Sequence, residues 1–80
     1  MKINVLLFAR YRELAGCQSV EVEVPEGATM AAVWDEVIQA VPALRPEGRP
    51  LMACDRAYAK PDRIIEGGEE IAAFPPVSGG

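Results

Sequence analysis

One amphipathic helix, set between short runs of β-forming residues, constrains the fold of this 80-residue chain more than any other feature. Thr29 is a typical helix N-cap, and the apolar residues after it recur at the three- and four-residue spacing of a helix face. The helix is expected to run to about Val41, because Pro42 follows. Its apolar face comprises Met30, Val33, Trp34, Val37, Ile38 and Val41. This face must be buried, which predicts that Trp34 lies in a core.

The remaining pattern is mainly that of β-strands. Residues 2–9 are apolar on both faces, as in a central strand, whereas residues 18–24 alternate apolar and polar side chains, as in a half-buried strand. A helical turn over residues 10–15, ending at Gly16, is expected between them. After the helix, residues 42–50 contain three prolines and predict a loop with one short turn. Further strands are expected at residues 51–54, 58–60 and 70–74.

The order is strand, strand, helix and then two or three strands. A right-handed crossover after the helix would bring a later strand beside the first, in parallel. The order predicts an α+β fold: a ubiquitin-like β-grasp roll, with a mixed sheet of four to five strands and one main helix packed on one face. Residues 1–74 would form this domain, and residues 75–80 an extended C-terminal tail.

Composition excludes several classes of function. The chain has no histidine, so it cannot build a Ser-His-Asp or Cys-His nucleophile system or a His-ligated zinc site, and no metal site is expected. A net charge of −4 without a basic run argues against nucleic-acid binding and favours binding to basic patches on partner proteins. The longest apolar run, residues 5–9, is too short to span a membrane. We therefore expect a cytoplasmic protein that binds neither nucleic acid nor membrane.

The two cysteines, Cys17 and Cys54, are far apart in sequence and form no CxxC motif. Two cysteines are too few for a disulfide scaffold or a four-thiolate cluster. We interpret them as reduced thiols that serve mainly in packing. Cys54 lies in an expected strand and is the better candidate for a buried position.

The last six residues carry the strongest functional signal. Pro75 and Pro76 favour an extended conformation that projects the tail away from the domain. Gly79 and Gly80 have no side chains, so they can enter a channel too narrow for other residues. The reactive group would be the α-carboxylate of Gly80, which ATP can activate as an acyl-adenylate. Sulfur can then convert the adenylate into a thiocarboxylate. Val77 and Ser78 complete the tail, and no base is available to activate the Ser78 hydroxyl.

Three stretches make the chain resemble the small subunits of molybdopterin synthase, which are ubiquitin-like sulfur carriers. They are VLLFARYRELAG at residues 5–16, LMAC at 51–54 and EGGEEIAAFPPVSGG at 66–80. FPPVSGG at the end of the chain is the most specific part. The resemblance covers the whole chain without large gaps.

The resemblance implies a sulfur carrier that is not an enzyme alone. An E1-like enzyme would adenylate Gly80 with ATP, a sulfur donor system would supply the thiocarboxylate, and no cofactor would be bound by the carrier. The tail would then enter the large synthase subunit, which would hold the catalytic side chains. There it would donate sulfur to cyclic pyranopterin monophosphate to form the molybdopterin dithiolene. Three alternatives use the same terminus: thiamine synthesis, tRNA thiolation, and conjugation as a ubiquitin-like modifier.

A partner surface is expected on the face of the sheet opposite the helix. If Ile3, Val5 and Leu7 face the helix, strand alternation places Leu6 and Phe8 on the open face. In the last strand, Ile71 and Ala73 would face the core, and Ala72 and Phe74 would face outward. Phe8, Phe74 and Tyr58 would then form an apolar patch, which usually indicates a partner. The alternative is that loops cover the two Phe rings.

Two arginines near this surface leave their role open. Arg10 and Arg12 either bind acidic residues of the activating enzyme or are solvated surface charges. Of the two, Arg12 is included among the candidate partner-binding residues.

Overall fold

The computed structural model describes residues 1–76, and Val77, Ser78, Gly79 and Gly80 lie outside the described residues. The elements are β1 (Lys2–Leu7), α1 (Arg10–Ala15), β2 (Ser19–Glu23), α2 (Met30–Ala40), the 3-10 helix η1 (Pro42–Glu47), β3 (Leu51–Cys54), β4 (Ala57–Ala59) and β5 (Ile71–Phe74). All the expected elements are present, with ends shifted by one or two residues. The expected loop at residues 42–50 holds a longer helical segment than the single short turn predicted.

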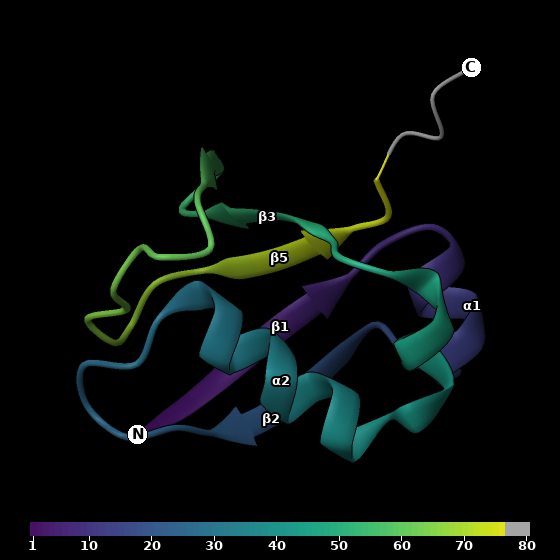
Figure 1. Cartoon of the computed structure of the whole chain (residues 1–80), viewed down its shortest axis with the longest axis horizontal. Helices are drawn as coiled ribbons and strands as arrows, with labels where there is room; N and C mark the ends of the chain where they lie inside the picture. The colour runs from purple at the N-terminus through teal and green to yellow at the C-terminus, as the bar shows by residue number, and fades with distance from the viewer. Residues whose placement is uncertain (77–80) are drawn as a thin grey trace.

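The five strands form one mixed sheet in the order β2-β1-β5-β3-β4. β1 and β5 are parallel, with Val5 opposite Ile71, and the other neighbouring pairs are antiparallel. Helix α2 covers one face of this sheet (Figure 1). The predicted β-grasp fold, with a mixed sheet of four to five strands, is confirmed, and the sheet has five. The parallel pairing of β1 with β5 is the one that a right-handed crossover predicts from the element order.

Helix α2 begins where the sequence predicts. The Thr29 side-chain oxygen accepts a hydrogen bond from the Ala32 amide at 3.2 Å, which satisfies one of the free N–H groups of the first turn. Four residues of the apolar face are fully buried against the sheet: Met30, Val33, Trp34 and Val37. Ile38 and Val41, nearer the end of the helix, are only partly buried. The predicted core position of Trp34 is confirmed.

Helix α1 is short and ends at Gly16, as expected. Gly16 adopts a left-handed conformation with φ 72°, and its amide donates to the Arg12 carbonyl oxygen at 3.0 Å. Tyr11 is buried, with its ring centroid 5.1 Å from that of Trp34. This contact fastens α1 to the core beneath α2.

The boundary between domain and tail falls at the end of β5. Phe74 is the last residue of that strand, and Pro75 follows directly. The division into a domain of residues 1–74 and a tail of residues 75–80 stays a prediction. No helix among residues 1–76 is long and apolar enough to cross a membrane.

Candidate functional site

Strand alternation divides the sheet into a core face and an open face. On β1, Ile3, Val5 and Leu7 are at most 2% exposed, whereas Leu6, and Phe8 directly after the strand, project to the other side. On β5, Ile71 and Ala73 are fully buried in the core. The predicted orientation of both strands is therefore correct.

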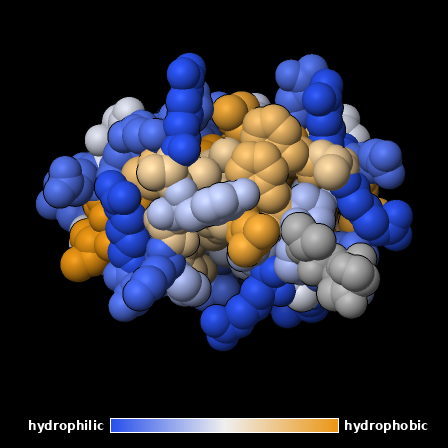
Figure 2. Space-filling view, turned by 90° about the horizontal axis from the view of Figure 1, so that it is seen from above, coloured by the Kyte–Doolittle hydropathy of each residue, from blue (hydrophilic) through white to orange (hydrophobic). Residues whose placement is uncertain are grey.

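The strand register brings apolar residues together on the open face. Leu6 lies opposite Ala72, Ala72 opposite Ala53, and Ala53 opposite Tyr58, which makes one row across four strands. With Phe8 and Phe74 these residues line a hollow of about 350 Å³, with Arg56 and Glu70 also on its wall. We call its six apolar residues the open-face patch: Leu6, Phe8, Ala53, Tyr58, Ala72 and Phe74. Figure 2 shows apolar side chains gathered on the surface with hydrophilic ones around them.

Two phenylalanines form the centre of the open-face patch. The rings of Phe8 and Phe74 are stacked, with centroids 4.6 Å apart and planes inclined by 10°. Phe8 is 37% exposed, Tyr58 is 77% exposed and Phe74 is half-buried, so the alternative that loops cover the two Phe rings is not met for Phe8. The structure brings together the three aromatic residues chosen from the sequence. Their role in binding a partner stays a prediction.

The backbone that presents Phe8 is strained. Ala9 adopts φ 53° and ψ −128°, a conformation that favours glycine. It allows the Tyr11 amide to donate to the Phe8 carbonyl oxygen at 3.2 Å, so that the chain turns directly from β1 into α1. On the other side, the Phe8 amide donates to the Ala73 carbonyl oxygen, also at 3.2 Å.

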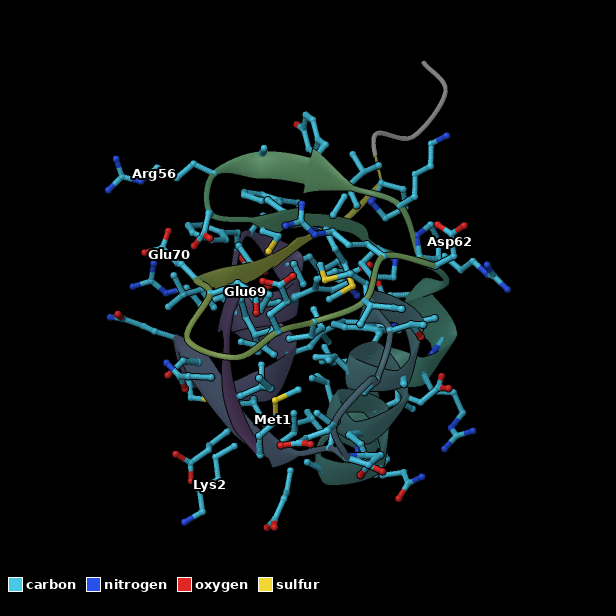
Figure 3. The ribbon with its side chains drawn as sticks, turned by 90° about the vertical axis from the view of Figure 1, so that its left-hand side faces the viewer. Met1, Lys2, Arg56, Asp62, Glu69 and Glu70 are labelled. Atoms are coloured by element: carbon cyan, nitrogen blue, oxygen red, sulfur yellow. The ribbon has the colours of Figure 1, made fainter. Side chains whose placement is uncertain are left out.

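Charged residues border the patch on one side. Arg56 and Glu70 lie on the same side of the molecule (Figure 3), with the Arg56 Nε atom 4.0 Å from a Glu70 carboxylate oxygen. Arg10 is paired elsewhere, through its Nε atom to a Glu47 carboxylate oxygen at 3.0 Å. Arg12 is exposed on α1 and is not part of the lining of the hollow. The structure therefore does not join Arg12 to the aromatic residues.

The two cysteines differ in environment. Cys17 is exposed and Cys54 is buried at 2% exposure, as the strand position of Cys54 predicted. Burial raises the pKa of the Cys54 thiol, and the nearby negative charge of Glu69 raises it further. A raised pKa disfavours the nucleophilic thiolate. Within residues 1–76 no three His, Cys, Asp or Glu side chains are grouped so that they could hold a metal ion.

Two features of the surface were missed from the sequence. Arg56 reaches the open-face patch because Asp55 and Arg56 both have positive φ, at 51° and 70°, in the tight turn between β3 and β4. A second hollow of about 430 Å³ lies beside β4, with Trp34, Arg49 and Tyr58 among its lining residues. No periodicity signals either feature, because both depend on how β4 is set against its neighbours.

The described part of the tail is short. Pro75 is half-buried at the end of β5, and Pro76 is exposed. The predicted tail residues Val77, Ser78, Gly79 and Gly80 lie outside the described residues. Their chemical role stays a prediction.

Comparison with known proteins agrees with this fold. The model of the ThiS family matches residues 5–80. The molybdopterin synthase sulfur carrier subunit of Arabidopsis thaliana is 37% identical over 82 residues, covering all of this chain and 84% of the relative. The corresponding subunit of Haemophilus influenzae is 38% identical, covering 98% of this chain and 99% of the relative.

A solved structure gives the same fold at full length. The structure of SAMP1 from Haloferax volcanii, a small archaeal modifier protein, superposes with a TM-score of 0.86 at 32% identity and covers all of both chains. Family model, full-length relatives and fold thus converge. This chain belongs to the ThiS family, in the group of the molybdopterin synthase sulfur carrier subunits.

Proposed function

We propose that this chain is a sulfur carrier subunit of a molybdopterin synthase and that the Gly80 carboxylate is the group that carries the sulfur. The full-length likeness to sulfur carrier subunits is the observation that supports this most directly. The position of Pro75 and Pro76 immediately after β5 adds to it, because the tail then starts at the end of a strand held at the centre of the sheet.

The proposed chemistry takes place on the main chain. A carboxylate is a poor electrophile, so an E1-like enzyme first joins Gly80 to the AMP of ATP and releases pyrophosphate. Sulfide-level sulfur from the donor then attacks the acyl carbon, displaces AMP and leaves a thiocarboxylate, whose soft sulfur is the better nucleophile. The carrier itself needs no bound cofactor for these steps. The raised pKa of Cys54 makes this thiol a poor substitute for the terminal group.

The open-face patch is the proposed docking surface for the large subunit. Its exposed aromatic rings lie on the sheet face opposite α2, beside the strand that leads into the tail. Docking there would bury these rings and direct the tail into the partner. The catalytic side chains, and delivery of sulfur to cyclic pyranopterin monophosphate, would belong to the large subunit. The expected cytoplasmic location is part of the same proposal.

The likeness to SAMP1 favours one alternative, a protein modifier. A modifier would use the same Gly80 carboxylate, but it would form isopeptide bonds with lysines of target proteins instead of a thiocarboxylate. The two functions differ in the covalent product that Gly80 forms, and this difference can be measured.

The deciding experiment follows the terminus. The chain is incubated with its activating enzyme, ATP and a sulfur source. Its intact mass is measured before and after addition of the large subunit and cyclic pyranopterin monophosphate. The native chain should gain one sulfur in exchange for one oxygen and should then support molybdopterin formation. Deletion of Gly80, or addition of one residue after it, should abolish both without lowering the melting temperature.

A matched control and a contradicting outcome complete this test. Ser78→Ala changes the tail without touching the carboxylate and should behave as wild type. A chain lacking Gly80 that still supports molybdopterin synthesis at the normal rate would contradict the proposal. Masses corresponding to chain-conjugated target proteins, without any thiocarboxylate, would favour the modifier.

A further inference from the structure

We propose that Phe8 is a positioning residue, which acts through its stacked partner Phe74 to fix the direction in which the C-terminal tail leaves the domain. The inference rests on the proposed function and goes beyond docking, since it assigns Phe8 an effect on sulfur transfer after the partner is bound. The juxtaposition that carries it is a nearly parallel ring pair, formed by the residue after β1 and the last residue of β5.

Phe74 stands at the root of the tail. β5 ends at this residue, and its neighbour Pro75 begins the tail. Beyond Ala73 the parallel pairing with β1 stops, because Leu7 opposite Ala73 is the last pair in the register. Antiparallel pairing with Leu51 holds Phe74 from one side only. The Phe8 ring therefore supplies the contact on the other side, at a centroid distance of 4.6 Å.

Phe8 is itself firmly held. Its amide donates to the Ala73 carbonyl oxygen, and its carbonyl oxygen accepts from the Tyr11 amide, each at 3.2 Å. Tyr11 is fully buried and packs on Trp34. Hydrogen bonds on both sides, and an anchor in the core, hold the Phe8 backbone in place, so its ring is attached at a fixed point beside Phe74.

The two prolines transmit this placement. The proline ring fixes φ near −65°, and a residue that precedes proline is restricted to extended conformations. Phe74 and Pro75 both precede a proline. Few rotations therefore remain between the Phe74 ring and Pro76, so a shift of Phe74 moves the start of the tail as one piece. Precise placement of a reacting group contributes strongly to reaction rates.

The test compares two residues on the same face of the sheet, one in β1 and one directly after it. Phe8→Leu keeps an apolar side chain in the open-face patch but removes the stacked ring. Leu6→Ala is the control, since it trims the same patch at a position opposite Ala72, two residues before Phe74 at the end of β5. Phe8→Tyr restores the ring, and its hydroxyl can reach water because Phe8 is 37% exposed.

Three quantities are measured for each variant. Calorimetry gives the Kd for the large subunit, and a single-turnover assay with the thiocarboxylated chain and saturating large subunit gives the transfer rate. NMR residual dipolar couplings of the Cα–H bonds of Pro75 and Pro76 in the free chain report the order of the tail root. Thermal melts confirm that each variant is folded.

The expected result is a separation of binding from transfer. Phe8→Leu should weaken binding by no more than Leu6→Ala does, but should lower the saturated transfer rate about threefold to tenfold and reduce the Pro75 and Pro76 couplings, as loss of one aromatic pair predicts. Phe8→Tyr should restore both the rate and the couplings. Leu6→Ala should weaken binding while the saturated rate and the couplings stay at wild-type values.

Other outcomes overturn the inference. A Phe8→Leu variant with weaker binding but a normal saturated rate and normal couplings would make Phe8 a docking contact alone. Unchanged couplings in that variant would refute positioning even where the rate falls. If the wild-type chain transfers no sulfur, the proposed function fails, and the couplings still decide whether Phe8 orders the root of the tail.

Discussion

The carboxylate of Glu69 lies over the backbone of Gly67, with one oxygen 2.7 Å from the Gly67 nitrogen. The Glu66 amide donates to the same carboxylate at 3.0 Å. Gly67 and Gly68 both have positive φ, so the loop before β5 curls around this side chain. Figure 3 shows Glu69 beside the loop, whereas Glu70 lies further out toward Arg56. One carboxylate thus stabilises the turn that leads into β5, the central strand of the sheet.

This contact predicts a specific acid sensitivity. Desolvation acts to raise the pKa of Glu69, but hydrogen bonds from the Glu66 and Gly67 amides, with Cys54 and Arg63 nearby, outweigh it and lower the pKa. The unfolded chain therefore takes up a proton at higher pH than the folded chain, and stability is lost as the pH falls from the usual glutamate range through the lowered value. Glu69→Gln should flatten this part of the pH profile.

Thermal melts between pH 7 and pH 3 measure this effect. Glu66→Gln is the matched control, because Glu66 contributes its amide to the contact and not its carboxylate. Its melting temperature should fall with pH as steeply as that of the wild type. Equal slopes for wild type and Glu69→Gln would show that Glu69 does not carry the acid sensitivity.

Strain at Ala9 predicts a stabilising substitution. Ala9→Gly should raise stability by about 1 kcal/mol. A non-glycine residue at positive φ costs about 1–2 kcal/mol, and the larger conformational entropy that glycine loses on folding offsets part of the gain from removing this cost. For a domain of this size the melting temperature should rise by about 4–8 °C. Ala31→Gly in α2 is the control and should lower it. A lower melting temperature for Ala9→Gly would mean that the Ala9 methyl group stabilises the turn.

A charge on the open face tests docking separately from folding. Phe8→Asp should leave the domain folded, since position 8 is partly exposed in the free chain. Docking would desolvate the new charge at a cost of several kcal/mol, so affinity for the large subunit should fall by orders of magnitude. Calorimetry measures the affinity, and a melt of the isolated variant monitors folding. Binding at wild-type strength would show that the open-face patch is not part of the interface with the large subunit.

The cysteines are expected to be dispensable for sulfur loading. Cys17→Ser combined with Cys54→Ala should still form the thiocarboxylate at Gly80. The only cost should be about 1 kcal/mol of stability, from the cavity left at buried Cys54. Intact mass measures loading, and Cys17→Ser alone should melt like wild type because Cys17 is exposed. A folded double variant that cannot be loaded would reveal a thiol intermediate.

Local rules explain what could be predicted from the sequence. Alternation along β1 gave the correct faces for Val5 and Phe8, and the Thr29 cap located the start of α2, because both depend on neighbours within a few residues. The parallel pairing of β1 with β5 followed from the handedness of crossovers. These three features together determined the fold and brought Phe8 near Phe74.

The rest depends on contacts that no local pattern encodes. Alanine at position 9 gives no signal of positive φ, and Asp55 with Arg56 forms a tight turn without the usual glycine. The 3-10 helix at Pro42–Glu47 contains two prolines and was expected as a loop, since proline normally interrupts helices. Contacts with the rest of the domain stabilise this helix: the Arg10–Glu47 ion pair on the surface and the burial of Leu44 in the core.

The central place of β5 bears on how the chain folds. β1 pairs with β2 and β3 with β4, but these two hairpins share no ladder, and β5 alone joins them. An isolated two-stranded ribbon is marginal in water, so the β3–β4 hairpin should not persist before residues 71–74 arrive. Every pairing that closes the sheet is long in sequence separation, which favours slow, cooperative folding over stepwise growth. Closure of the sheet and formation of the tail root are thus a single kinetic event, and a partly folded chain would not present Phe74 to a partner.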